Sequence, residues 1–217
     1  MADRRQRASY IALWVFALAF GWIEAAAVVY LRETSPRDAV SAVQFPLTFI
    51  AANLVPVEIV REACTLIVLG AVAWVAARRW ADLVGAFLLI FGVWDLAYYA
   101  TLRLVTGWPD GLSNWDLLFL IPLPWVAPVW APATVAAIFV AAGSYLFWTP
   151  SRLRRYTPGD AAVILASAAA IVGAFLVEWR VVFSHDVPQH FPDWLYWAGV
   201  AAGTACFVHA ERRRVLR

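Results

Sequence analysis

The sequence contains no lysine, and all 17 of its basic residues are arginines. This absence excludes a Schiff-base retinal pigment, a nucleotide site built on a P-loop lysine, and an enzyme with a lysine nucleophile. Two cysteines are too few for a disulfide framework. The chain also lacks a Gly-rich nucleotide loop, a zinc-protease motif and histidines at positions suited to ligate haem within a membrane. We therefore expect no cofactor.

Charged residues are scarce as well. They make up 15% of the 217 residues, whereas 63% of the residues are apolar. A soluble domain of this size is usually about 45–50% apolar and about 25% charged. Intrinsic disorder requires low hydrophobicity and high net charge, so it is excluded. The net charge of +2 gives no reason to expect nucleic acid as a partner. The composition predicts a polytopic membrane protein.

Six segments are long and apolar enough to cross a bilayer, which requires about 20 residues each. They cover residues 10–31, 57–77, 82–104, 125–148, 158–180 and 194–210. We predict an all-α bundle of six transmembrane helices that forms one integral membrane domain over residues 1–217. A cleaved signal peptide is the alternative for the first segment. It is disfavoured because the apolar run is long and Glu24 lies where a cleavage motif needs small residues.

The positions of the arginines predict the orientation of these spans. With the N-terminus inside, the cytoplasmic segments hold 12 of the 17 arginines, and each of those segments holds at least two. Cytoplasmic loops are enriched in arginine and lysine in membrane proteins. We therefore expect a multi-pass protein with both termini in the cytoplasm.

Residues 113–148 are too long for one straight span and contain four prolines. Ser113-Asn114-Trp115-Asp116 has the pattern of a capping box, which predicts the start of a short helix. We predict a proline-broken half-helix at residues 113–121, a break at Pro122–Pro124, and then the fourth span. A single kinked packing helix is the alternative.

Two further motifs concern helix ends and helix packing. Thr157-Pro158-Gly159-Asp160 predicts an N-cap, a proline in the first turn and an acid that suits the helix dipole. Gly199 and Gly203 form a GxxxG motif, which lets another helix approach closely. This motif is the expected docking face for a membrane partner subunit.

Ionisable residues inside membrane spans are costly, so they are candidates for function. At a rise of about 1.5 Å per residue, Glu24, Glu62 and Asp95 lie about 8–13 Å below the outer ends of their helices. Glu178, on a fourth span, lies closer to the same surface. Acids from four spans thus share the outer half of the bilayer, which indicates one polar site.

The helical spacing of these residues also places them on one side of each span. One stripe on the second span consists of Glu58, Arg61, Glu62 and Thr65. Another on the third span consists of Asp95, Tyr98, Tyr99 and Arg103. Both stripes have helical spacing on otherwise apolar segments. The predicted ligand-binding residues are Glu24, Glu58, Arg61, Glu62, Asp95, Tyr98, Tyr99 and Arg103.

Simpler interpretations exist for some of these residues. Glu58 lies in the first turn of its helix, where an acid suits the dipole, and Arg61 and Arg103 are natural counter-ions. Two arginines cannot neutralise every acid in this layer. We therefore expect at least one carboxyl either to be protonated or to bind a cation.

Two outer loops add candidates of other kinds. Residues 32–56 contain an apolar stretch, Phe45–Ile50, that suits a lid over a pocket. The loop at 181–193 holds His185, Asp186, His190 and Asp193, residue types that bind metals. These residues lack the helical spacing of known metal motifs, so we expect a solvated loop and no metal site.

Several short strings are shared with a known group of proteins. They are Gly21-Trp22-Ile23-Glu24, Tyr30-Leu31-Arg32-Glu33, Val60-Arg61-Glu62-Ala63, Phe91-Gly92-Val93-Trp94-Asp95, Trp115-Asp116-Leu117-Leu118 and Ile121-Pro122-Leu123-Pro124-Trp125. Together they make residues 15–135 resemble a family of uncharacterised bacterial six-span inner-membrane proteins with no established activity. The resemblance implies a location in the bacterial inner membrane.

Three functions fit these observations. The first is an outward-facing pocket that binds a small polar or amphiphilic ligand or a cation, by analogy with the membrane-embedded capture subunits of vitamin transporters. The second is an intramembrane enzyme on a lipid or isoprenoid substrate, with a glutamate or aspartate as general acid and Trp22, Trp94 or Tyr98 stabilising a cation. The third is an accessory subunit of a larger membrane complex.

Overall fold

A computed structural model of the chain describes residues 4–33, 54–77, 80–149, 156–181 and 188–215. These residues contain six long helices and one short β-hairpin. The helices are α1 (Arg4–Glu33), α2 (Val55–Ala76), α3 (Trp80–Thr106), α4 (Trp130–Trp148), α5 (Pro158–Leu176) and α7 (Asp193–Val215). The strands are β1 (Trp115–Phe119) and β2 (Trp125–Pro128). Each of the six predicted spans overlaps one of these helices.

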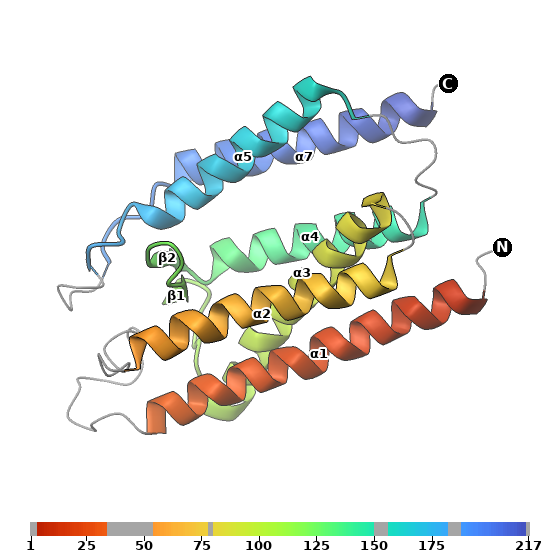
Figure 1. Cartoon of the computed structure of the whole chain (residues 1–217). Coiled ribbons are helices and arrows are strands. Elements are labelled where there is room, and N and C mark those ends of the chain that lie inside the picture. Colours follow the sequence, from red (N-terminus) through yellow and green to blue (C-terminus); the bar gives the residue numbers. More distant parts are fainter. Residues whose placement is uncertain (1–3, 34–53, 78–79, 150–155, 182–187, 216–217) are drawn as a thin grey trace.

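The helices form two groups (Figure 1). In the first group, which we call the four-helix body, α3 packs against α1, α2 and α4. In the second group, which we call the α5–α7 pair, these two helices run side by side. The start of α1 and the end of α7 lie at one end of the molecule and the β-hairpin lies towards the other. We call these the terminal end and the hairpin end.

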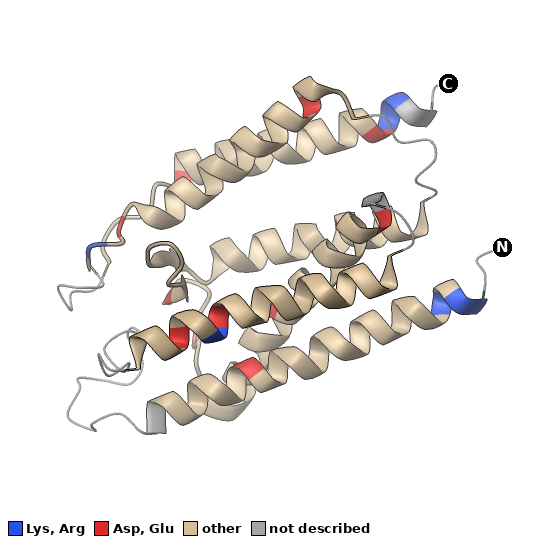
Figure 2. Cartoon of the chain, in the orientation of Figure 1, with Lys and Arg blue, Asp and Glu red and all other residues tan. Residues whose placement is uncertain are grey.

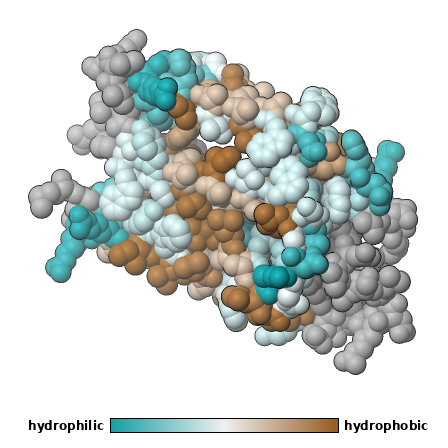
Figure 3. Space-filling view, turned by 180° about the vertical axis from the view of Figure 1, so that it is seen from behind, coloured by the Kyte–Doolittle hydropathy of each residue, from teal (hydrophilic) through white to brown (hydrophobic). Residues whose placement is uncertain are grey.

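Five of the helices are long and apolar enough to cross a membrane: α1, α2, α3, α4 and α5. Many large apolar side chains on them are exposed, including Ile11, Val75 and Leu165, which suits contact with lipid. Figure 3 shows apolar residues gathered across the middle of one face, with hydrophilic residues mainly towards its ends. The chain is therefore an integral membrane protein. The more polar α7 does not meet the same criterion, so the sixth span stays a prediction.

Glycines bring the helices of the four-helix body into backbone contact. A Cβ atom at Gly143 of α4 would lie 2.4 Å from the backbone nitrogen of Leu89, and one at Gly92 of α3 would lie 2.4 Å from the carbonyl oxygen of Ala136. Gly21 of α1 approaches α3 in the same way. Such small residues allow close packing of membrane helices. The body is consequently tightly packed along α3.

The predicted start of α5 is confirmed. Thr157 is the N-cap, and its hydroxyl accepts a hydrogen bond from the backbone N–H of Asp160. The Asp160 carboxylate in turn accepts the backbone N–H of Thr157, which completes a capping box. The side chain of Arg213, from α7, also donates to Asp160 at 2.5 Å. The cap therefore joins α5 to the end of α7.

The segment before α4 is a β-hairpin, so the predicted half-helix at 113–121 is wrong. Trp115 pairs with Pro128 and Asp116 with Ala127 in an antiparallel register. The side chain of Asn114 accepts the N–H of Gly111, so it closes a turn instead of capping a helix. Prolines 122 and 124 disfavour helix at the residues before them, and a short apolar run fits a strand as well as a helix. Since β2 occupies 125–128, α4 begins at Trp130 and not at 125.

Aromatic residues join the α5–α7 pair to the body at the hairpin end. The Trp130 ring of α4 stacks on Trp197 of α7, with ring centroids 5.6 Å apart and planes at 4°. The hydroxyl of buried Tyr196 donates to the carbonyl of Ala131 at 2.7 Å. Phe175 of α5 contacts Trp125 of β2. We call these five side chains and the Ala131 carbonyl the aromatic joint.

The GxxxG motif of α7 is used within the chain. A Cβ atom at Gly199 would lie 2.8 Å from the carbonyl oxygen of Ser167, and one at Gly203 would lie 3.2 Å from the Ser167 Cβ. The close approach predicted from the spacing is confirmed, and the helix that approaches is α5. The partner subunit expected at this face stays a prediction, because α5 already contacts both glycines.

Candidate functional site

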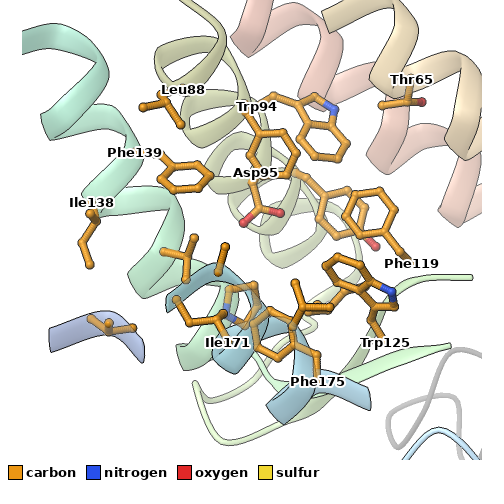
Figure 4. Close-up of a pocket in the computed structure, with 18 of the residues that line it drawn as sticks. Thr65, Leu88, Trp94, Asp95, Phe119, Trp125, Ile138, Phe139, Ile171 and Phe175 are labelled. Carbon is orange, nitrogen blue, oxygen red and sulfur yellow. The ribbon is translucent and has the colours of Figure 1, made fainter. Parts of the chain in front are cut away.

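A cavity of about 840 Å³ lies between the four-helix body and the α5–α7 pair. Most of its wall is apolar and comes from α3, α4, α5, α7 and the hairpin. Figure 4 shows Leu88, Phe139, Phe119 and Phe175 among the side chains that surround it. The cavity runs along the helices from the hairpin end towards Tyr156 and Phe207, which lie nearer the terminal end.

The polar part of the cavity wall lies towards the hairpin end. Seven of the eight residues predicted to bind a ligand line the cavity: Glu24, Glu58, Arg61, Glu62, Asp95, Tyr98 and Tyr99. Figure 2 shows acidic residues of α1 and α2 on the hairpin-end half of these helices, with basic residues at the terminal ends of α1 and α7. The helical spacing and depth of the sequence motifs thus correspond to one shared wall.

Arg61 ties α2 to α1 at this wall. Its guanidinium forms an ion pair with Glu24 of α1 and donates two hydrogen bonds to Glu58, at 2.9 and 2.5 Å. The hydroxyl of Thr65 donates to the other Glu24 oxygen at 2.6 Å. Both glutamates are buried. One arginine is therefore shared by two buried carboxylates and fixes their positions.

Glu62 connects α2 to the hairpin. Its carboxylate accepts the backbone N–H of Leu120, which follows β1, at 2.8 Å. Irregular backbone at membrane depth requires partners for its polar groups. Glu62 supplies such a partner and still lines the cavity. This carboxylate therefore has a structural contact in addition to its place in the wall.

Asp116 is a site residue that the sequence interpretation assigned to a helix cap. Only 1% of Asp116 is exposed, and its carboxylate accepts the hydroxyl hydrogen of Tyr99 at 2.8 Å. Asp116 lies on strand β1, and the position of this strand places it in the cavity wall. No local pattern distinguishes it from a capping residue, because its partner Tyr99 lies 17 residues away in the sequence.

Asp95 lies in the middle of α3 and its carboxyl group points into the cavity (Figure 4). It is partly buried, and the exposed part faces the cavity. Within the described segments of the chain, no side chain or backbone group forms a hydrogen bond or ion pair with it. Among the described residues, the carboxylate of Asp95 therefore has no protein partner and is available to bind another molecule.

Arg103, the eighth predicted residue, does not line the cavity. It is exposed and donates hydrogen bonds to the carbonyls of Gly107 and Pro109, just beyond the end of α3. A basic side chain near a helix C-terminus satisfies carbonyls that have no partner within the helix. Trp22, considered as a cation-stabilising residue, is 54% exposed on the outer face of α1 and does not line the cavity.

The other candidates lie in loops. Among the residues that the structure describes, no group of three or more His, Cys, Asp or Glu is arranged to hold a metal. His185 and Asp186 lie outside the described residues, as does the apolar stretch Phe45–Ile50 that suits a lid. The metal and lid hypotheses therefore stay untested by the structure.

Comparisons with protein-family models, with curated proteins and with solved structures give no match for this chain. The resemblance to uncharacterised bacterial inner-membrane proteins is not tested by them. The wall of the cavity is polar at one end and mostly apolar over the rest, which is the complement of an amphiphilic molecule.

Proposed function

We propose that this integral membrane protein binds an amphiphilic ligand in the cavity between the four-helix body and the α5–α7 pair. The polar head of the ligand lies against Asp95, Glu62 and the Arg61 ion pairs. Its apolar part lies along α4, α5 and α7. The protein acts as a capture or transport-related protein for this ligand.

The observation that carries the proposal is the division of one cavity wall into two parts. Carboxylates, an arginine and tyrosine hydroxyls gather towards the hairpin end, and the rest of the wall is mostly apolar, with Tyr156, Ser167 and Thr204 as its polar members. Ligand pockets commonly have volumes of about 300–1,000 Å³ and combine apolar walls with a few convergent polar groups. The cavity, at about 840 Å³, falls in this range.

The membrane arrangement that suits this function has six spans and both termini in the cytoplasm of a bacterium. Two observations support it. The start of α1 and the end of α7 lie at the same end of the molecule, which requires an even number of crossings between them if α7 crosses the membrane beside α5. Arginines accumulate in the segments assigned to the cytoplasm. The polar part of the cavity then lies in the outer half of the membrane.

Blocking the cavity tests the proposal. Ala168 and its neighbour Ala169 are both exposed, but only Ala168 lines the cavity. The full-length protein is purified from bacterial membranes, and retained molecules are identified by native mass spectrometry and lipid extraction. We expect an amphiphile on the wild-type protein and on Ala169→Trp, and its loss from Ala168→Trp.

The two tryptophan variants are matched in size and in helix, so a general effect on the fold would change both. Equal retention by the two variants would show that the molecule binds elsewhere on the protein surface. A wild-type protein that retains no amphiphile would also contradict the proposal.

A second candidate function, an intramembrane enzyme acting on a lipid or isoprenoid substrate, is favoured by one observation. Asp95, a carboxyl group without a protein partner among the described residues, lies in a mostly apolar, aromatic-walled cavity, where a general acid would be kept from water. Incubation of the purified protein with the amphiphile that it retains separates the two functions. A binding protein returns the molecule unchanged, and an enzyme converts it in a reaction that Asp95→Asn abolishes.

A further inference from the structure

We infer that the head of the bound amphiphile is a cation, such as a quaternary or protonated amine, and that it lies beside Asp95 against aromatic rings. This inference rests on the proposed function and specifies the chemical class of its ligand. Three observations carry it: the partners of the cavity carboxylates, the side chains around Asp95, and the charge balance of the wall.

The first observation is that the other carboxylates already have partners. Glu24 and Glu58 share Arg61. Glu62 accepts a backbone N–H of the hairpin, and Asp116 accepts the hydroxyl of Tyr99. In the parts of the chain that the structure describes, Asp95 has no such donor, although it points into the cavity (Figure 4). A buried carboxylate needs a compensating charge or hydrogen bond, so its partner is expected to come from the ligand.

The second observation is the aromatic wall beside Asp95. Phe91 and Trp94 of α3 have ring centroids 5.4 Å apart, and Phe91 lies 5.9 Å from Phe139 of α4. All three residues line the cavity. Phe119 and Trp125 of the hairpin form another ring pair on its wall, with centroids 5.5 Å apart. Aromatic faces attract cations, especially away from water.

The third observation is the charge balance. Among the described residues that line the cavity, five are carboxylic acids and one is an arginine. The acids are Glu24, Glu58, Glu62, Asp95 and Asp116. An anionic head would add repulsion in a region of low dielectric constant, where charge interactions are strong. A neutral head would leave Asp95 without a counter-charge. A cationic head satisfies Asp95 and reduces the excess of negative charge.

The test compares three amphiphiles with the same alkyl chain and different heads. Dodecyltrimethylammonium is the cation, dodecyldimethylamine oxide is the neutral compound at neutral pH, and dodecyl phosphate is the anion. The full-length protein in nanodiscs is exposed to an equimolar mixture, and native mass spectrometry measures the occupancy of each. We expect the cation to exceed the neutral compound by about tenfold, because an ion pair and cation–π contacts are both made only by the cation.

Two variants test which residues cause the preference for the cationic compound. Asp95→Asn should bring the cation and the neutral compound to nearly equal occupancy, whereas Asp110→Asn, the same change at an exposed site outside the cavity, should leave the preference intact. Phe139→Leu keeps an apolar side chain but removes an aromatic face, and it should lower cation binding without lowering binding of the neutral compound. This variant keeps the inference testable if Asp95→Asn does not fold.

The outcomes also separate the inference from the proposed function. Equal binding of the cation and the neutral compound to the wild-type protein, or a preference for the anion, would overturn the inference while the amphiphile site stands. Binding of none of the three compounds would overturn the inference and would contradict the proposed function as well. A cation preference that Asp95→Asn leaves unchanged would place the cation elsewhere and overturn the inference.

Discussion

The four-helix body and the α5–α7 pair are each closely packed internally, but they meet each other in a different way. Within the body, Gly143 and Gly92 bring α3 and α4 into backbone contact, and within the pair Gly199 does the same for α5 and α7. Between the two groups, large rings make the contacts at the aromatic joint and a cavity of about 840 Å³ remains beside them. Glycines therefore lie where helices pack in backbone contact, and large aromatic residues lie where the two groups of helices meet beside the cavity.

The largest expected loss of stability comes from breaking the ion pairs that join α1 and α2 in the four-helix body. Arg61→Leu leaves Glu24 and Glu58 buried without their counter-charge, and removing one partner of a buried ion pair typically costs about 3–5 kcal/mol. The free energy of unfolding, measured by SDS titration in mixed micelles, should fall by that amount.

Two controls sharpen this prediction. Arg103→Leu removes an exposed arginine that only donates to carbonyls beyond α3, so it should cost about 1 kcal/mol. Combining Arg61→Leu with Glu24→Gln and Glu58→Gln removes the uncompensated charges and should recover most of the loss. If Arg61→Leu were no more destabilising than Arg103→Leu, the ion pairs would not hold α1 and α2 together.

The next prediction concerns the close packing of α3 against α4. Gly143→Ala places a Cβ atom 2.4 Å from a backbone nitrogen of Leu89, which cannot move without shifting α3. Overpacking of this kind costs about 1–3 kcal/mol. The matched change Gly70→Ala meets no atom within 4 Å. It should stabilise α2 by about 0.5–1 kcal/mol, since glycine is a poor helix former. The same titration measures both, and a similar result for the two variants would contradict the close packing.

The smallest effect tests the aromatic joint. Tyr196→Phe keeps the buried ring but removes the hydroxyl that donates to the Ala131 carbonyl, and loss of one such hydrogen bond costs about 1 kcal/mol. Tyr145→Phe, at a tyrosine that is 41% exposed, should leave the free energy of unfolding unchanged. Equal losses for both variants would show that the Tyr196 hydrogen bond does not fasten the pair to the body.

Periodicity and depth were sufficient to predict the polar wall. Glu24, Glu62 and Asp95 lie in long apolar helices whose rise per residue is fixed, so their depth and face follow from sequence position alone. The same holds for Thr157 and Asp160, whose capping box depends on residues three apart. These features are local consequences of helix geometry.

Features that depend on distant residues could not be predicted. The run at 115–119 is too short for its pattern to distinguish strand from helix, and its pairing with β2 decides the matter. Asp116 becomes a site residue only because the hairpin brings it to Tyr99. Arg103 shares the spacing of the α3 stripe, but the carbonyls beyond the helix end provide partners that draw it out of the site.

Among the described residues, aromatic rings join the α5–α7 pair to the rest of the chain both at the aromatic joint and nearer the terminal end. At the hairpin end α5 contacts β2, and α7 contacts α4 through the stacked rings of Trp130 and Trp197. Nearer the terminal end the rings of Tyr145 and Phe207 have centroids 6.0 Å apart. Because α5 is about 28 Å long, a rotation of about 10° at the joint displaces its far end by about 5 Å. Such a rotation would separate Tyr145 from Phe207 and widen the cavity nearer the terminal end, while the polar wall beside the joint would keep its geometry.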